Sequence, residues 1–362
     1  MNQLSNTPPI HSGQKNRVEF FDLAKGFCIL LVVVFHVTEY YGVDMPASDM
    51  VKSMRLPLYF FLSGCFFKTY SGFIDFLVRK TNKLLIPLVF WFLFASLLLP
   101  IIFTRFGIIL FPQFQSIKSI LIGFVYGKFP NSAIWFLLCL FWVNVMFYLI
   151  SIIARKFKNT LAAIIVLSVL TGLIGVTFGA FSIRIPFFID SAFTSLPFFI
   201  FGYLVYRYSP IVEPNEYDKW IPVIILVLLV LMYFFSPYYS LKYNQRVNYH
   251  SFLYIYLCGF AGALTVVLLS KWIKRLSIFN FWGRYSIMIL VSHGMVYQLV
   301  GYALKYSGLS VTWCCVINLL VTMGVCSLLI PLFIKYMPYV TAQKDMVSIR
   351  EQKFPKTENK NS

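Results

Sequence analysis

The sequence predicts an all-α fold, a polytopic transmembrane helical bundle with about ten membrane helices. Hydrophobic residues make up 59% of the 362 residues and charged residues only 12%, so the chain could not build a water-soluble surface. Apolar runs recur from residue 18 to residue 334 without a polar interval long enough to fold alone. We therefore predict one membrane domain over residues 17–337, between a flexible tail (1–16) and a disordered basic tail (338–362).

The membrane helices can be placed from the apolar runs, because a helix needs about 20 apolar residues to cross a bilayer. In chain order the candidate segments are 18–38, 54–70, 84–103, 133–153, 160–179, 191–206, 220–236, 250–270, 285–304 and 311–334. The second segment is short and polar at both ends, and residues 116–126 resemble a re-entrant or interfacial helix. Counts of nine and eleven therefore stay open.

The basic residues predict the orientation. The formal charge of +18 is spread over short clusters between the apolar runs, which indicates topology signals rather than a nucleic-acid partner. Lys and Arg are more than twice as frequent on the side that holds both termini as on the other side. We therefore expect both termini in the cytoplasm and the protein in the plasma (inner) membrane, with membrane lipid around it. The seven cysteines all lie in apolar segments without a CxxC pair, so no metal site is expected.

The first membrane helix carries charges, and charges inside a membrane helix are candidates for function because they are costly. Lys25 and His36 are eleven positions apart, which places them within about 20° on the same helix face and about 16 Å apart along the axis. Asp22 precedes Lys25 by three residues and Glu39 follows His36 by three, so each has a neighbour within contact distance. This pattern suits a histidine base oriented by a carboxylate, with a cation at another depth.

The same residues resemble a known family. The run DLAKG at 22–26, followed by an apolar stretch and Phe35-His36, is similar to the acyltransferase 3 signature, in which a basic residue precedes a histidine with ten residues between. Lys25 stands where most members have arginine, and lysine binds phosphate as a point charge rather than bidentately. Further similar stretches are MRLPLYFFLSG at 54–64, IWFLL at 134–138, LPFFIFGY at 196–203 and, more weakly, FWGRYSIMILVSH at 281–293.

The resemblance implies an O-acyltransferase that moves an acyl group, most simply acetyl, from cytoplasmic acetyl-CoA to a hydroxyl of a cell-surface glycan or lipid-linked sugar. It implies His36 as the base, with a transient acyl-histidine as a variant. Glu39, from its spacing, is either an orienting carboxylate for His36 or simply an outer-loop carboxylate just past the membrane surface. The resemblance also implies Lys25, with Asp22 beside it, at the phosphates of the donor.

Other residues have two interpretations each. Arg55 and Ser63 of the second segment are candidates for substrate binding, although Arg55 could be an interfacial anchor. Trp135 could stack on a sugar or belong to an interfacial aromatic belt. His293 could bind substrate or simply pack, and Arg284 could meet a donor phosphate or act as a positive-inside anchor.

A transporter or flippase for a sugar or lipid-linked glycan is the alternative from another class, since buried charges in a helical bundle would serve it equally. Transporters usually contain paired half-chain repeats, and the sequence shows no convincing pair. A channel is less favoured because most of the segments are apolar on all sides.

Overall fold

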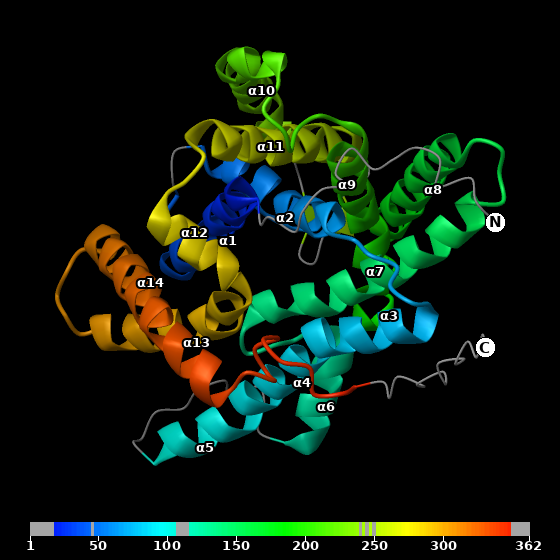
Figure 1. Cartoon of the computed structure of the whole chain (residues 1–362). Coiled ribbons are helices and arrows are strands. Elements are labelled where there is room, and N and C mark those ends of the chain that lie inside the picture. Colours follow the sequence, from blue (N-terminus) through cyan, green and yellow to red (C-terminus); the bar gives the residue numbers. More distant parts are fainter. Residues whose placement is uncertain are drawn as a thin grey trace, which may run out of the picture.

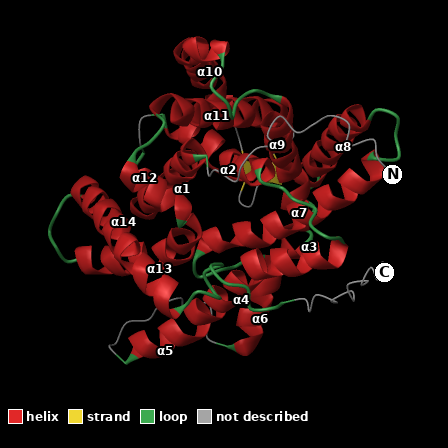
Figure 2. Ribbon diagram, in the orientation of Figure 1, coloured by secondary structure: helices red, strands yellow, loops and turns green. Residues whose placement is uncertain are grey.

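The computed structural model describes residues 18–44, 47–105, 116–238, 241–242, 246–247 and 251–348, which form a helical bundle (Figures 1 and 2). The longer helices are α1 (Glu19–Tyr41), α2 (Ser48–Cys65), α3 (Phe73–Lys80), α4 (Ile86–Leu93), α5 (Leu99–Thr104), α6 (Ile117–Tyr126), α7 (Trp135–Ala154), α8 (Thr160–Ala180), α9 (Ile189–Tyr208), α10 (Ile221–Phe235), α11 (Phe252–Ile273), α12 (Ser277–Arg284), α13 (Ser286–Leu304) and α14 (Val311–Tyr336). Short 3₁₀ turns η4 (Ser132–Ile134), η5 (Pro186–Phe188), η6 (Glu216–Trp220) and η7 (Ser236–Tyr238) flank some of them. The two-residue strands β1 (Leu241–Lys242) and β2 (Arg246–Val247) pair antiparallel.

Nine helical segments of the described chain are long and apolar enough to cross a membrane, which confirms an integral membrane protein. They correspond to nine of the ten predicted segments. The tenth, 54–70, corresponds to α2, which begins at Ser48 and ends at Cys65. Its first half contains the charged residues Asp49, Lys52 and Arg55, so this half is more polar than a typical membrane span. Its second half is mostly buried. The expected short helix at 116–126 is present as α6.

The predicted span 84–103 is part of a longer helical segment, Phe73–Thr104. Two π turns, η1 (Thr81–Leu85) and η2 (Phe94–Leu98), interrupt it, and each is followed at the second position by a proline, Pro87 or Pro100. Proline has no N–H and its ring displaces the carbonyl four residues earlier, so a locally widened helix accommodates it. The chain therefore continues as a helix through both prolines.

Helix α1 lies inside the bundle, packed against α2, α11, α12, α13 and α14 (Figure 1). Its closest neighbour is α12, a short helix that the sequence did not predict. A Cβ added to Gly26 would overlap the carbonyl of Phe279, and one added to Gly283 would overlap the carbonyl of Asp22. Small residues let helix backbones approach closely in membranes. These two glycines fix the angle and depth at which α12 crosses α1.

The C-terminal tail is ordered further than expected. It was predicted to be disordered from residue 338, but residues 338–348 fold back against the helical segment that contains the π turns. Trp91 Nε1 donates a hydrogen bond to Val340 O at 2.9 Å. The side chain of Asn82 donates to Val347 O at 2.7 Å and accepts from the backbone N–H of Val347 at 2.9 Å. These long-range hydrogen bonds hold the start of the tail, and composition alone does not reveal them. The remainder of that tail, like the tail at 1–16, lies outside the described residues.

Candidate active site

One cluster of polar side chains forms where α1, α2 and α13 meet, and we call it the histidine group: His36, Glu39, Arg55, His293 and Tyr297. The ring centroids of His36 and His293 are 5.5 Å apart, and the His36 ring lies parallel to that of Tyr297 at 6.4 Å. The side chain of His36 is 12% exposed, whereas His293 is fully buried. The fold thus joins the histidine of the first helix to a second histidine more than 250 residues later in the chain.

The hydrogen bonding of His293 fixes its tautomer. Its Nδ1 lies 2.9 Å from the carbonyl oxygen of Ile289, one turn earlier in α13. A carbonyl can only accept, so Nδ1 carries the proton and Nε2 carries the lone pair. Nε2 is buried and has no hydrogen-bond partner among the described residues. A buried acceptor without a partner is costly, and such groups are typical of binding or catalytic sites.

The carboxylate predicted to orient His36 is within reach but exposed. Glu39 Oε2 is 3.8 Å from His36 Nδ1, and the Glu39 side chain is 64% exposed. At this distance the two groups form an ion pair only when the imidazole is protonated. Water at Glu39 also screens the interaction, so Glu39 affects His36 more weakly than an enclosed carboxylate would.

Arg55 belongs to the same group. Its guanidinium carbon lies 3.5 Å from the centroid of the Phe35 ring, and the Phe35 ring contacts that of His36 edge-on at 5.3 Å. The guanidinium therefore lies beside the histidine base, stacked on the residue that precedes it. A fixed cation at this place can stabilise negative charge that develops on a reacting oxygen.

Two polar residues that the sequence reasoning missed support the histidine group. Asn318 is fully buried in α14, and its Nδ2 donates to Tyr297 O at 2.9 Å and to Tyr41 Oη at 3.1 Å. The Asn131 side chain donates to Leu290 O at 3.0 Å, one turn from His293 in α13. An asparagine within an apolar span is itself a signal of function or of specific packing, so Asn318 could have been singled out.

Lys25 lies at the other end of α1. Its Nζ is 4.3 Å from the centroid of the Phe66 ring, just after α2, so its charge faces the aromatic end of a neighbouring helix. Asp22 is buried at the crossing with α12. Arg284 is exposed at the C-terminal end of α12, and it follows Gly283, which packs on the backbone of Asp22. The three residues predicted for the donor thus surround one crossing of two helices.

Two predicted binding residues lie outside the histidine group. The hydroxyl of Ser63 donates to the carbonyl of Tyr59 in its own helix at 2.8 Å, near the Lys25 end. Trp135 begins α7, is 6% exposed, and its ring lies 5.4 Å from that of Phe188. The structure therefore brings Arg55 and His293 to His36, and it positions Ser63 and Trp135 elsewhere.

A known protein family matches the part of the chain that contains these residues. The model of a family described as an acyltransferase domain matches residues 18–338, which is nearly the whole described chain. The match includes both ends of α1, the α12 crossing and the histidine group. Comparisons with curated proteins and with solved structures gave no match.

Proposed function

The chain belongs to the acyltransferase 3 family of membrane acyltransferases, and on this premise we propose that it transfers an acetyl group from acetyl-CoA to a sugar hydroxyl. The acceptor is a cell-surface glycan or a lipid-linked sugar. The observation that carries the proposal is the arrangement along α1, with Lys25 at one end and two facing imidazoles at the other. Eleven residues of helix separate the two ends by about 16 Å.

In the proposed reaction His36 acts as general base. As the acceptor oxygen attacks the thioester carbonyl, a C–O bond forms, the C–S bond breaks, and the hydroxyl proton passes to His36. The proton then passes to the thiolate of coenzyme A, so the imidazole returns to its neutral form. His36 rather than His293 fits this role because its side chain is partly exposed, whereas His293 is fully enclosed.

The other members of the histidine group support this step. Arg55 stabilises the oxyanion that forms on the thioester carbonyl. The Nε2 lone pair of His293 accepts a hydrogen bond from a water between the two rings. That water donates its other proton to the oxygen of the acceptor hydroxyl, whose own proton then points toward His36. Glu39 stabilises the transient imidazolium only weakly, because its carboxylate is exposed and lies 3.8 Å from the ring.

At the opposite end, Lys25 attracts the phosphates of the donor as a point charge, with Asp22 and Arg284 beside it. The donor is made in the cytoplasm, so this end of α1 faces the cytoplasm and the histidine group faces outward. Both termini are then cytoplasmic and the protein resides in the plasma (inner) membrane, as the distribution of Lys and Arg favours.

Two substitutions of His293 separate the roles of its nitrogens. His293→Asn keeps a polar atom near the Nδ1 position and removes the one at Nε2, whereas His293→Gln keeps a polar atom near Nε2. We expect kcat to fall about 100-fold in the Asn variant and much less in the Gln variant, with an unchanged KM for the donor, because only the lone pair at Nε2 faces the reaction. Equal losses in both variants would reduce His293 to a packing residue.

The proposed function is tested by release of free coenzyme A from acetyl-CoA by the purified protein, measured with and without glycan acceptors. An acyltransferase releases the thiol only when an acceptor is present and labels that acceptor. A transporter or flippase would move the acceptor across a vesicle membrane and leave the thioester intact. Transport without thioester cleavage would contradict the proposal.

A further inference from the structure

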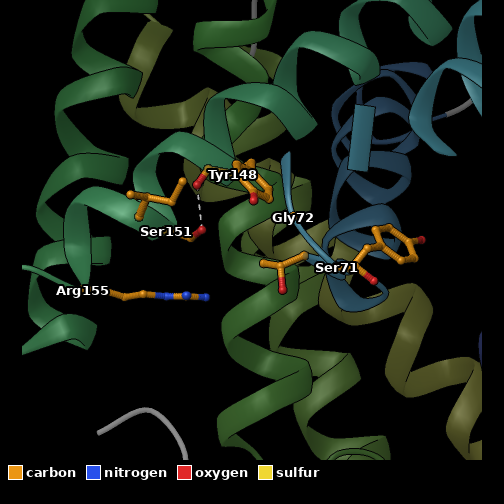
Figure 3. A pocket seen from close by; sticks show the side chains of 8 residues that line it. Ser71, Gly72, Tyr148, Ser151 and Arg155 are labelled. Atoms are coloured by element: carbon orange, nitrogen blue, oxygen red, sulfur yellow. Dashed lines mark hydrogen bonds between the residues drawn. The ribbon is translucent and has the colours of Figure 1, made fainter. Parts of the chain in front are cut away.

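A separate polar pocket lies between the end of α7 and the loop that joins α2 to α3 (Figure 3). Residues 69–72 form one wall, and Tyr148, Ser151, Ile152 and Arg155 form the other. Its volume is about 230 Å³. Pockets that enclose a whole small ligand usually measure about 300–1,000 Å³, so this one fits a single end group of a larger molecule.

The lining of the pocket suits an anion. The side chain of Arg155 extends into the space between the two walls (Figure 3), and no residue of the lining is acidic. The nearest carboxylate along the loop, that of Asp75, is already bound by Arg79 Nε at 2.8 Å and by the backbone N–H of Ser71 at 3.2 Å. Guanidinium groups bind phosphate with two parallel hydrogen bonds, which adds geometric specificity to the charge.

Hydroxyl and aromatic groups complete the pocket. Thr69, Tyr70 and Ser71 contribute hydroxyl groups to the lining, and hydroxyl and phenol groups are hydrogen-bond donors at neutral pH. The Tyr70 ring is covered by the Arg79 guanidinium at 4.9 Å, and the Tyr148 ring packs on Phe73 and Phe76 at 5.2 and 4.6 Å, so both rings form rigid parts of the wall. The hydroxyl of Ser151 is not available, because it donates to the carbonyl of Tyr148 at 2.7 Å.

The pocket lies at the Lys25 end of the bundle. Phe66, whose ring contacts Lys25, precedes Thr69 by only three residues, which separates their backbones by at most about 11 Å. Arg155, which lines the same pocket as Thr69, therefore lies at the same end of the bundle as Lys25. A long donor bound in the pocket by one end can extend past Lys25 toward the histidine group.

We propose that this pocket binds a phosphate monoester, the one on the ribose at the nucleotide end of the acyl-CoA donor, with Arg155 as its main ligand. The inference rests on the proposed function and adds to it a second donor contact, distinct from Lys25. A lipid head group carries the same phosphate chemistry and is the rival occupant. The two differ because coenzyme A has a terminal ribose phosphate that dephospho-coenzyme A lacks.

The test measures binding of coenzyme A and of dephospho-coenzyme A to the full-length protein in nanodiscs, prepared with neutral lipid alone and with added anionic lipid. We expect the wild type to bind coenzyme A more tightly than the dephospho form. Arg155→Gln should weaken binding of coenzyme A about tenfold or more and leave the dephospho form unchanged, so that the preference is lost. Lys156→Gln removes the neighbouring charge, which is not part of the lining, and should keep the preference.

Three results would overturn the inference, and they point to different failures. If the wild type binds coenzyme A and Arg155→Gln retains the preference, the pocket is not the donor site and the proposed function stands. Anionic lipid could instead weaken coenzyme A binding by the wild type until it equals that of Arg155→Gln. The pocket is then a lipid head-group site. If the wild type binds neither form, the proposed function itself fails.

Discussion

His36→Ala is expected to lower kcat for acyl transfer by about 10²–10⁴-fold, the range that general acid–base catalysis usually contributes. The substitution removes the only imidazole of the pair that is partly exposed, and His293 cannot replace it because that ring is fully buried and bound to Ile289 O. Binding of acetyl-CoA should persist, because Lys25 lies at the other end of α1. The measurement is acyl transfer by purified protein, together with donor binding in the same preparation.

The matched control for this variant is Thr38→Val, two residues later in the same helix. The Thr38 hydroxyl bonds only to carbonyls of its own helix, those of Val34 and Phe35, and valine has nearly the same shape. We expect Thr38→Val to retain wild-type transfer. Transfer at the wild-type rate by His36→Ala would remove the histidine from the mechanism.

Gly283→Leu is expected to destabilise the protein by at least about 3 kcal/mol, the upper end of the usual cost of overpacking. A Cβ at this position would overlap the carbonyl of Asp22, and backbone cannot rotate away as a side chain can. Helix α12 would have to separate from α1, which removes the contact that holds Asp22 and Arg284 near Lys25. The expected readouts are a lower unfolding midpoint in detergent and a smaller folded yield.

Gly324→Leu is the control for that change. Gly324 lies on an exposed part of α14, and a Cβ there would meet no heavy atom within 4 Å. This variant should unfold at the wild-type midpoint or above it, since leucine favours helix over glycine by roughly 0.8 kcal/mol. Equal stability of Gly283→Leu and Gly324→Leu would contradict the close crossing of α1 and α12.

The fold class could be predicted from composition because lipid imposes a simple rule on segment length and polarity. Nine of the ten predicted segments correspond, in the described chain, to helices long and apolar enough to cross a membrane, and the tenth is α2. Helix α12 could not be predicted in this way, because its eight residues are too few for a span and its position depends on contacts with Asp22 and Gly26. The ordered start of the C-terminal tail was missed for the same reason, since Asn82 holds it from a distant part of the chain.

Part of the candidate site could also be predicted from the sequence. The spacing of Lys25 and His36 predicted one helix face, and in the structure both side chains turn toward protein, toward Phe66 and toward His293. The residues between them on that face, such as Ile29 and Val32, are buried. The pairing of His36 with His293 was not predictable, because it depends on how α13 packs against α1. Tyr297 follows His293 by four residues and could have been found as part of the same face.

The proposed transfer requires a donor at the Lys25 end of α1 and an acceptor at the His36 end. The most direct measurement uses proteoliposomes with protein of known orientation, radiolabelled acetyl-CoA supplied on one side and a glycan acceptor on the other. We predict that label reaches the acceptor only when the donor is on the side of Lys25, and that His36→Ala abolishes this transfer. Equal labelling with both compounds on the His36 side alone would contradict the account.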